Sequence, residues 1–140
     1  MTDEERKVVI TFLEEVIQEL KNGVGKDKEL EKLVTQYMNK LGIPAHVNGY
    51  HYIRTAIMVA MKDEDMLNGL TKKLYPEVAK NFNSTAAKVE RAIGSAIETM
   101  WFKGNVKAQF DIFGYSRVEE IKKPTNGKFL KVIVEYLKLI

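Results

Sequence analysis

The sequence predicts an all-α protein: a compact helical bundle containing a helix-turn-helix, with an extra amphipathic helix at the N-terminus. Apolar residues recur at helical spacing in several successive stretches. Turn and capping residues separate these stretches, and no sustained two-residue alternation indicates strands. Of the 140 residues, 45% are hydrophobic, which is enough for one core. We expect a boundary near residue 25, with a helix and hinge over 1–25 and the bundle over 26–140.

The N-terminal helix is expected over Thr2–Lys21. Thr2 and Glu5 have the spacing of a capping box. Its apolar residues follow at helical spacing: Val9, Phe12, Leu13, Val16, Ile17 and Leu20. Asn22-Gly23 and Gly25 are expected to end this helix in a short hinge. The apolar stripe either packs on the bundle or pairs with a second copy of the chain, and the sequence leaves both open.

The bundle helices are predicted from capping and breaking residues. The second helix begins at Asp27 and ends at Gly42-Ile43-Pro44. The others are expected over Tyr50–Lys62, from Asp63 or Asp65 to Leu74, from Pro76 to Phe82, from Ser84 or Thr85 to Gly104, and over Phe129–Ile140. A loop rich in aromatic residues is expected over 110–118. Several large side chains are expected in or near the core: Tyr50, Tyr52, Met58, Met61, Met66, Trp101 and Phe102.

A helix-turn-helix is predicted at Leu74–Gly104. Ala79 supplies the small residue where the two helices cross, and Asn83 tolerates the positive φ that the turn needs. Ser84 or Thr85 can cap the second helix, and Val89 is spaced to lock it onto the first. Further apolar residues complete the small core: Val78, Phe82, Ile93, Ala96 and Ile97.

The second helix of this motif, at 85–103, is expected to enter the major groove of double-stranded DNA. Lys88 and Arg91 can pair with guanine, and Glu90 can accept from cytosine, so these three are the predicted base readers. Phosphate or flanking contacts are assigned to further residues: Lys80, Ser84, Thr85, Ala87 and Ser95. Lys72, Lys73 and Lys103 are additional phosphate candidates.

Charge is distributed in a way that fits a polyanionic partner. The net charge is only +3, but residues 1–33 carry six basic and nine acidic residues, whereas residues 71–107 carry seven basic and three acidic. The chain has no cysteine, secretory signal or apolar run long enough to span a membrane, so we expect a cytoplasmic protein. No catalytic motif is present, and His46 and His51 lack further metal ligands at suitable spacing. We therefore expect neither an enzyme nor a cofactor.

Several stretches resemble one known family. These are LGIPAHVNGYHYIRTAI, LTKKLYPEVAKNFNSTAAKVERAI, FGYS and KPTN, which occur in order between about Leu41 and Ile133. They are similar to the C-terminal effector domain of stage zero sporulation protein A, a sporulation response regulator. The resemblance implies a helical, DNA-binding transcription regulator that acts as a homodimer on DNA. It also implies base reading by Glu90 and Arg91, and a backbone contact from Lys123.

The sequence departs from the family pattern at three positions of the reading helix. Lys88 replaces an arginine, and Gly94 and Ser95 stand where the family has a basic residue and a histidine. An alternative is therefore an interaction module that modulates a full-length relative and binds DNA weakly. The stretch Lys103–Tyr115 corresponds to the region that meets RNA polymerase sigma factor. The family's receiver domain is not recognised here, so we expect either a stand-alone relative or a fragment.

Overall fold

The computed structural model describes residues 1–114 and 123–140, and it divides the chain into two units, Met1–Leu33 and Val34–Ile140. Helices and turns account for the described residues, which include no strand, so the all-α prediction is confirmed. None of the helices in these ranges is long and apolar enough to cross a membrane. The domain boundary expected near residue 25 stays a prediction.

Helix α1 spans Asp3–Leu41 and supplies the first unit and the start of the second. Its start confirms the capping box, because the Glu5 N–H donates to Thr2 Oγ1 at 3.2 Å and the Thr2 N–H donates to Glu5 Oε2 at 3.4 Å. The predicted hinge is wrong, since the helix continues through Asn22, Gly23 and Gly25. A glycine ends a helix by adopting positive φ, and neither glycine has it.

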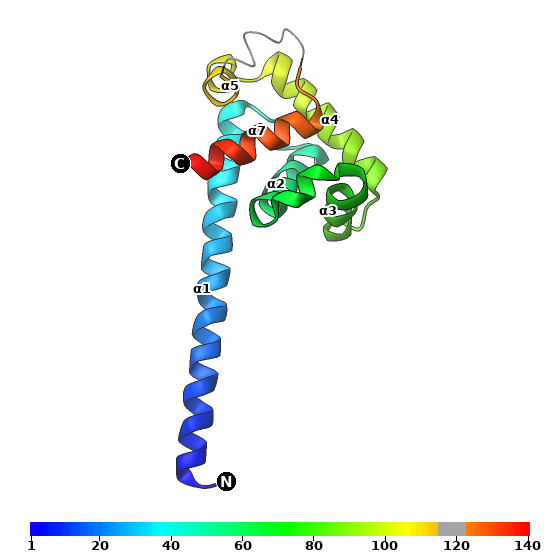
Figure 1. Ribbon diagram of the computed structural model, residues 1–140. Coiled ribbons are helices and arrows are strands. Elements are labelled where there is room, and N and C mark those ends of the chain that lie inside the picture. Colours follow the sequence, from blue (N-terminus) through cyan, green and yellow to red (C-terminus); the bar gives the residue numbers. More distant parts are fainter. Residues whose placement is uncertain (115–122) are drawn as a thin grey trace. The chain divides into compact units, whose positions relative to one another are not determined.

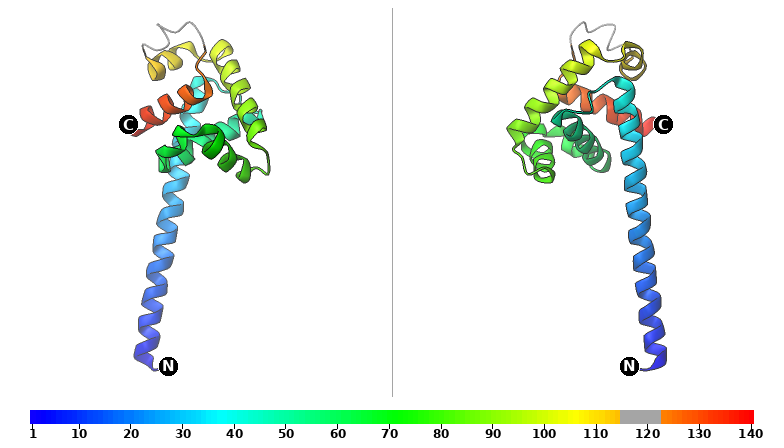
Figure 2. Two further views of the ribbon diagram at one scale, coloured as in Figure 1. Left: turned by 45° about the vertical axis from the view of Figure 1, so that its right-hand side comes forward. Right: turned by 180° about the vertical axis from the view of Figure 1, so that it is seen from behind.

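The second unit gathers its helices around one core (Figure 1). After the end of α1, its elements are α2 (Asn48–Lys62), the 3₁₀ helix η1 (Glu64–Asn68), the π-helix η2 (Leu70–Leu74), α3 (Tyr75–Asn81), α4 (Ala86–Lys103), α5 (Val106–Phe113) and α7 (Asn126–Leu139). Helix α4 packs against α2, α3 and α7, and α7 also contacts α2 and α5. In both views of Figure 2, α3 and the first half of α4 form the two arms of a corner.

Several predicted boundaries differ from the structure. The stretch before Leu74 is two short helices, because Asp63 caps η1 by accepting from the Asp65 N–H at 3.2 Å and η2 then runs directly into α3. Helix α7 begins three residues earlier than expected, because the Thr125 hydroxyl caps it by accepting from the Lys128 N–H. The expected aromatic loop is wrong over its described part, where α5 stands. The remainder of that loop, Tyr115 to Val118, lies outside the described residues.

The core of the second unit is built mainly from aliphatic side chains of α2, α4 and α7. Its largest fully buried side chains are Met38, Leu41, Ile53, Ile57, Leu74, Ile93, Ile97, Met100, Gln109, Phe129, Leu130 and Ile133. Tyr50 and Trp101 are buried as predicted. Phe82 and Phe102 are not, with exposed fractions of 39% and 71%. Phe82 instead lies edge-on to the Tyr52 ring at the surface, with 5.0 Å between ring centroids.

Candidate nucleic-acid interface

The turn between α3 and α4 has the geometry that the sequence predicts. Asn83 adopts φ 51°, and it is the only residue other than glycine with positive φ among those described. The Ser84 N–H then reaches back to the Ala79 carbonyl oxygen at 3.0 Å, which closes the end of α3 as in a Schellman motif. Ala79 itself is buried where α3 meets α4. These features are consistent with the predicted helix-turn-helix, which stays a prediction.

The first turn of α4 is fixed by one cap and one buried residue. Of the two predicted caps, Thr85 serves: its hydroxyl accepts from the Lys88 N–H at 3.2 Å. Val89 is fully buried, which anchors the helix as the spacing predicts. Because Val89 points inward, the neighbouring Lys88 and Glu90 lie on the exposed surface of α4.

The predicted base readers lie in the first turns of α4, on either side of the buried Val89. Lys88, Glu90 and Arg91 are all exposed, as are the predicted flanking residues Ala87 and Ser95. The surface therefore presents two cations and one carboxylate close to a helix N-terminus, which suits contact with base edges and phosphates. Their role on DNA is a prediction from geometry and residue type.

The predicted phosphate contacts lie at several places around this surface. Lys80 is exposed on α3, with Nζ 3.8 Å from Glu77 Oε2. Lys123 precedes α7 but reaches α4, where its Nζ lies 3.5 Å from Glu98 Oε2. Both pairs are solvent-exposed, so each contributes little to stability and leaves the lysine able to turn toward a phosphate. Lys73 is paired with an acidic residue, since its Nζ lies 2.5 Å from Asp65 Oδ2.

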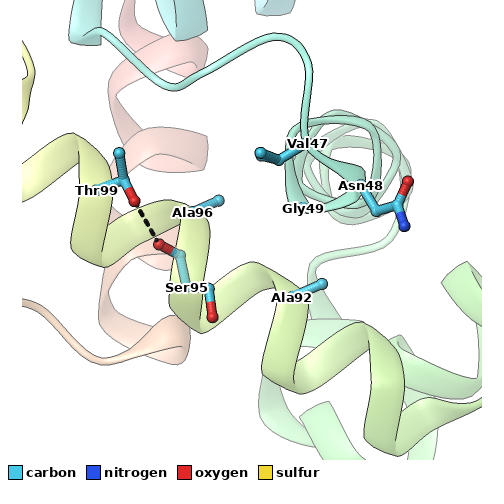
Figure 3. A pocket seen from close by; sticks show the side chains of 7 residues that line it. All are labelled: Val47, Asn48, Gly49, Ala92, Ser95, Ala96 and Thr99. Atoms are coloured by element: carbon cyan, nitrogen blue, oxygen red, sulfur yellow. Dashed lines mark hydrogen bonds between the residues drawn. The ribbon is translucent and has the colours of Figure 1, made fainter.

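The crossing of α2 and α4 depends on Gly49, in the first turn of α2. A Cβ at this position would lie 2.2 Å from the Ala92 carbonyl oxygen and 2.8 Å from Ala96 Cβ. Figure 3 shows this crossing, with Gly49 on α2 opposite Ala92 and Ala96 on α4; Val47, Asn48, Ser95 and Thr99 complete the lining of a cavity of about 210 Å³. The α2 backbone thus touches the middle of the proposed reading helix.

A second support is Asn126, at the first position of α7. Its Nδ2 donates to the Glu90 carbonyl oxygen at 3.0 Å and to the Tyr75 hydroxyl at 3.1 Å. Burial raises the pKa of Tyr75, with a smaller contribution from the Glu90 charge, so the phenol stays neutral and its oxygen accepts this bond. Gly94 lies beside the same amide, because a Cβ there would be 3.4 Å from Asn126 Oδ1. The residue pattern alone gives no signal for this role of Asn126.

Metal chemistry finds no support in the part of the chain that the structure describes. No group of three or more His, Asp or Glu side chains is placed to hold a metal ion there. His46 and His51 are both exposed, and His51 Nδ1 lies 3.3 Å from an Arg54 guanidinium nitrogen. These histidines therefore fit surface roles.

Comparison with known families agrees with this geometry. The family model described as sporulation initiation factor Spo0A C terminal matches residues 34–137. The match covers almost all of the second unit, including α3, α4, Gly49 and Asn126.

Proposed function

Because the chain belongs to the family of sporulation initiation factor Spo0A C-terminal domains, we propose that it is a sequence-specific transcription regulator. Members of this family are DNA-binding effector domains of sporulation regulators and not enzymes. In this proposal α4 enters the major groove of double-stranded DNA. The observation that carries it is the exposed group Lys88, Glu90 and Arg91 directly after the helix-turn-helix turn.

Each reader has a distinct chemical task in this proposal. Arg91 donates two hydrogen bonds to guanine O6 and N7, and Glu90 accepts from cytosine N4. Lys88 has one ammonium group in place of a planar fork, so it contributes charge and a single donor. The N-terminus of α4, with Ser84, Thr85 and Ala87, approaches the backbone, while Lys80, Ser95 and Lys123 hold phosphates at the flanks.

Two protein partners belong to the same proposal. Two copies bind neighbouring sites as a homodimer on DNA, as the family resemblance implies. RNA polymerase sigma factor would contact the region Lys103–Tyr115, of which the structure describes all but Tyr115. This region is largely helix α5, where Val106 and Phe110 are exposed; Phe102, one residue before the region, is exposed as well. Exposed apolar side chains of this kind suit a protein partner.

The decisive experiment measures binding to two DNA duplexes. A preferred duplex is selected from a random pool with the whole protein, and fluorescence anisotropy then compares it with a scrambled duplex over a salt series. We expect Arg91→Ala to weaken binding to the selected duplex by roughly ten- to hundredfold and to leave scrambled binding nearly unchanged. Lys80→Ala should instead weaken both duplexes and lower the salt slope by about 1.

Lys107→Ala is the matched control, because it also removes one exposed positive charge but lies on α5. It should leave discrimination between the duplexes unchanged. If the wild-type protein bound both duplexes alike, sequence-specific reading would be wrong, and the alternative of an interaction module with weak DNA binding would gain support.

A further inference from the structure

Helix α1 exposes a continuous apolar surface within the first unit, which we call the α1 stripe. Its central residues are Val9, Leu13, Val16 and Leu20, and its flanking residues are Ile10, Phe12 and Ile17. Six of the seven have exposed fractions between 44% and 65%: Val9, Ile10, Phe12, Leu13, Ile17 and Leu20. A surface of this kind is unfavourable in water, and a helix gains most of its stability by burying it.

The area of the α1 stripe is enough for a specific interface. Six half-exposed side chains of roughly 100 Å² each offer about 600 Å² per copy, or about 1,200 Å² for two copies, the lower end of the range for specific interfaces. Exposed charged residues lie on the opposite side of the helix, among them Lys7, Glu14 and Glu15.

The spacing of the α1 stripe indicates another helix as its partner. Val9, Leu13, Val16 and Leu20 are separated by four, three and four residues, which is the a/d spacing of a coiled-coil seam. A chain that carries one such seam can satisfy it with the same seam of a second copy, since a two-fold interface uses one patch twice.

Charged residues at the two ends of the seam determine the direction of pairing. Continuing the same spacing places Arg6 before Val9, and Gly23 and then Asp27 beyond Leu20. Parallel helices would set Arg6 against Arg6 and Asp27 against Asp27 of the partner, and like charges in a seam are destabilising. Antiparallel helices would set Val9 against Leu20 and Leu13 against Val16, and would keep the like charges apart.

We propose that the α1 stripe pairs two copies of this chain through antiparallel α1 helices. The pairing requires no DNA, so it is a homodimer interface separate from any contact between neighbouring DNA-bound copies.

Sedimentation equilibrium of the full chain without DNA tests the pairing. We expect a mass twice the 16.0 kDa of the chain, and a mass of 16.0 kDa for the double variant Leu13→Glu with Leu20→Glu. The matched control is Thr11→Glu with Gln18→Glu, which adds the same charge to the same turns on the opposite side and should remain dimeric. A monomeric wild-type protein, or a double variant Leu13→Glu with Leu20→Glu that still sedimented as a dimer, would overturn the proposal.

Engineered cysteines test the direction, because the chain has no cysteine of its own. Val9→Cys and Leu20→Cys variants are oxidised separately and as a mixture. Antiparallel pairing brings position 9 of one copy to position 20 of the other, so the disulfide should form mainly in the mixture. Efficient crosslinking within each separate variant would show parallel helices and contradict the proposed arrangement.

A different observation carries a second inference, which rests on the proposed function. Asn126 ties α7 to both arms of the helix-turn-helix, because one amide nitrogen donates to the Glu90 carbonyl oxygen on α4 and to the Tyr75 hydroxyl on α3. The Glu90 carbonyl lies between the proposed readers Glu90 and Arg91. We infer that Asn126 is a positioning residue, which fixes the rotation of α4 and hence the aim of the reading side chains.

The test separates positioning from general stability. Asn126→Asp keeps the shape but replaces the donor by a carboxylate that faces the Glu90 carbonyl. We expect about tenfold weaker binding to the selected duplex, unchanged binding to the scrambled duplex, and faster amide hydrogen exchange over 86–92. Tyr75→Phe, which keeps the Glu90 bond, should retain discrimination.

The measurements distinguish a failure of the proposed function from a failure of the positioning role of Asn126. A wild-type protein that binds both duplexes alike contradicts the proposed function, whereas the hydrogen exchange of Asn126→Asp still reports on positioning. If the wild type discriminates and Asn126→Asp discriminates equally, with unchanged exchange over 86–92, the positioning role is wrong.

Discussion

Replacing Gly49 by alanine should destabilise the second unit by about 3 kcal/mol, the upper part of the range for overpacking. The added methyl would lie 2.2 Å from the Ala92 carbonyl oxygen and 2.9 Å from the Ala92 carbonyl carbon. Both are backbone atoms in the middle of α4, so a side-chain rotation cannot relieve the contact. Thermal unfolding followed by circular dichroism should show the midpoint lowered by roughly 10–20 °C.

Gly94→Ala is the control, since it adds the same methyl group to α4 instead of α2. Its Cβ would meet only the Asn126 amide, at ordinary contact distances of 3.4 Å from Oδ1 and 3.9 Å from Nδ2. Gly94 lies inside α4, where alanine is favoured over glycine by about 1 kcal/mol, so this variant should unfold at a higher temperature than the wild type. Equal midpoints for the two variants would show that α2 and α4 can separate without cost.

The contrast between these glycines indicates what the sequence could predict. Asn83, Thr85 and Val89 were identified correctly because a turn, a cap and a helix anchor depend on residues close together in the chain. Gly49 and Asn126 were missed because each acts on α4 from a distant segment. Their partners, at Ala92 and Glu90, are backbone carbonyls, which leave no signal in the residue pattern.

The two errors in helix assignment have a related cause. Gly23 and Gly25 are compatible with a helix at a cost of about 1 kcal/mol each, so they end one only when the following chain turns away. At Gly42 the chain does turn, with φ 85°, and the Asn105 N–H then bonds the Leu41 carbonyl oxygen at 3.1 Å. For α5, the aromatic residues favoured a loop. A helix signal was nevertheless present at Asn105, whose side chain caps α5 by accepting from the Ala108 N–H.

The second large effect is expected at Phe129, whose truncation to alanine should lower the free energy of unfolding by about 3–5 kcal/mol. Phe129 is fully buried on α7, and its ring lies 5.6 Å from that of Phe113 on α5, centroid to centroid. Phe113 in turn meets Trp101 on α4 edge-on at 6.5 Å. The substitution would therefore open a cavity where three helices meet, and urea unfolding of the whole protein measures the loss.

Phe102→Ala is the matched control, because it removes the same type of side chain at an exposed position. Phe102 follows Trp101 on α4 and has an exposed fraction of 71%. Little apolar surface is lost from contact there, so the free energy of unfolding should change by less than about 0.5 kcal/mol. Sequence spacing alone placed Phe102 with Trp101 near the core, yet Phe102 points about 100° away from Trp101 around α4 and lies on the exposed side of the helix. A large loss in the free energy of unfolding for Phe102→Ala would mean that this ring is covered in solution. A small one leaves Phe102 as a surface group, together with Val106 and Phe110, available to the protein partner proposed for this side of the second unit.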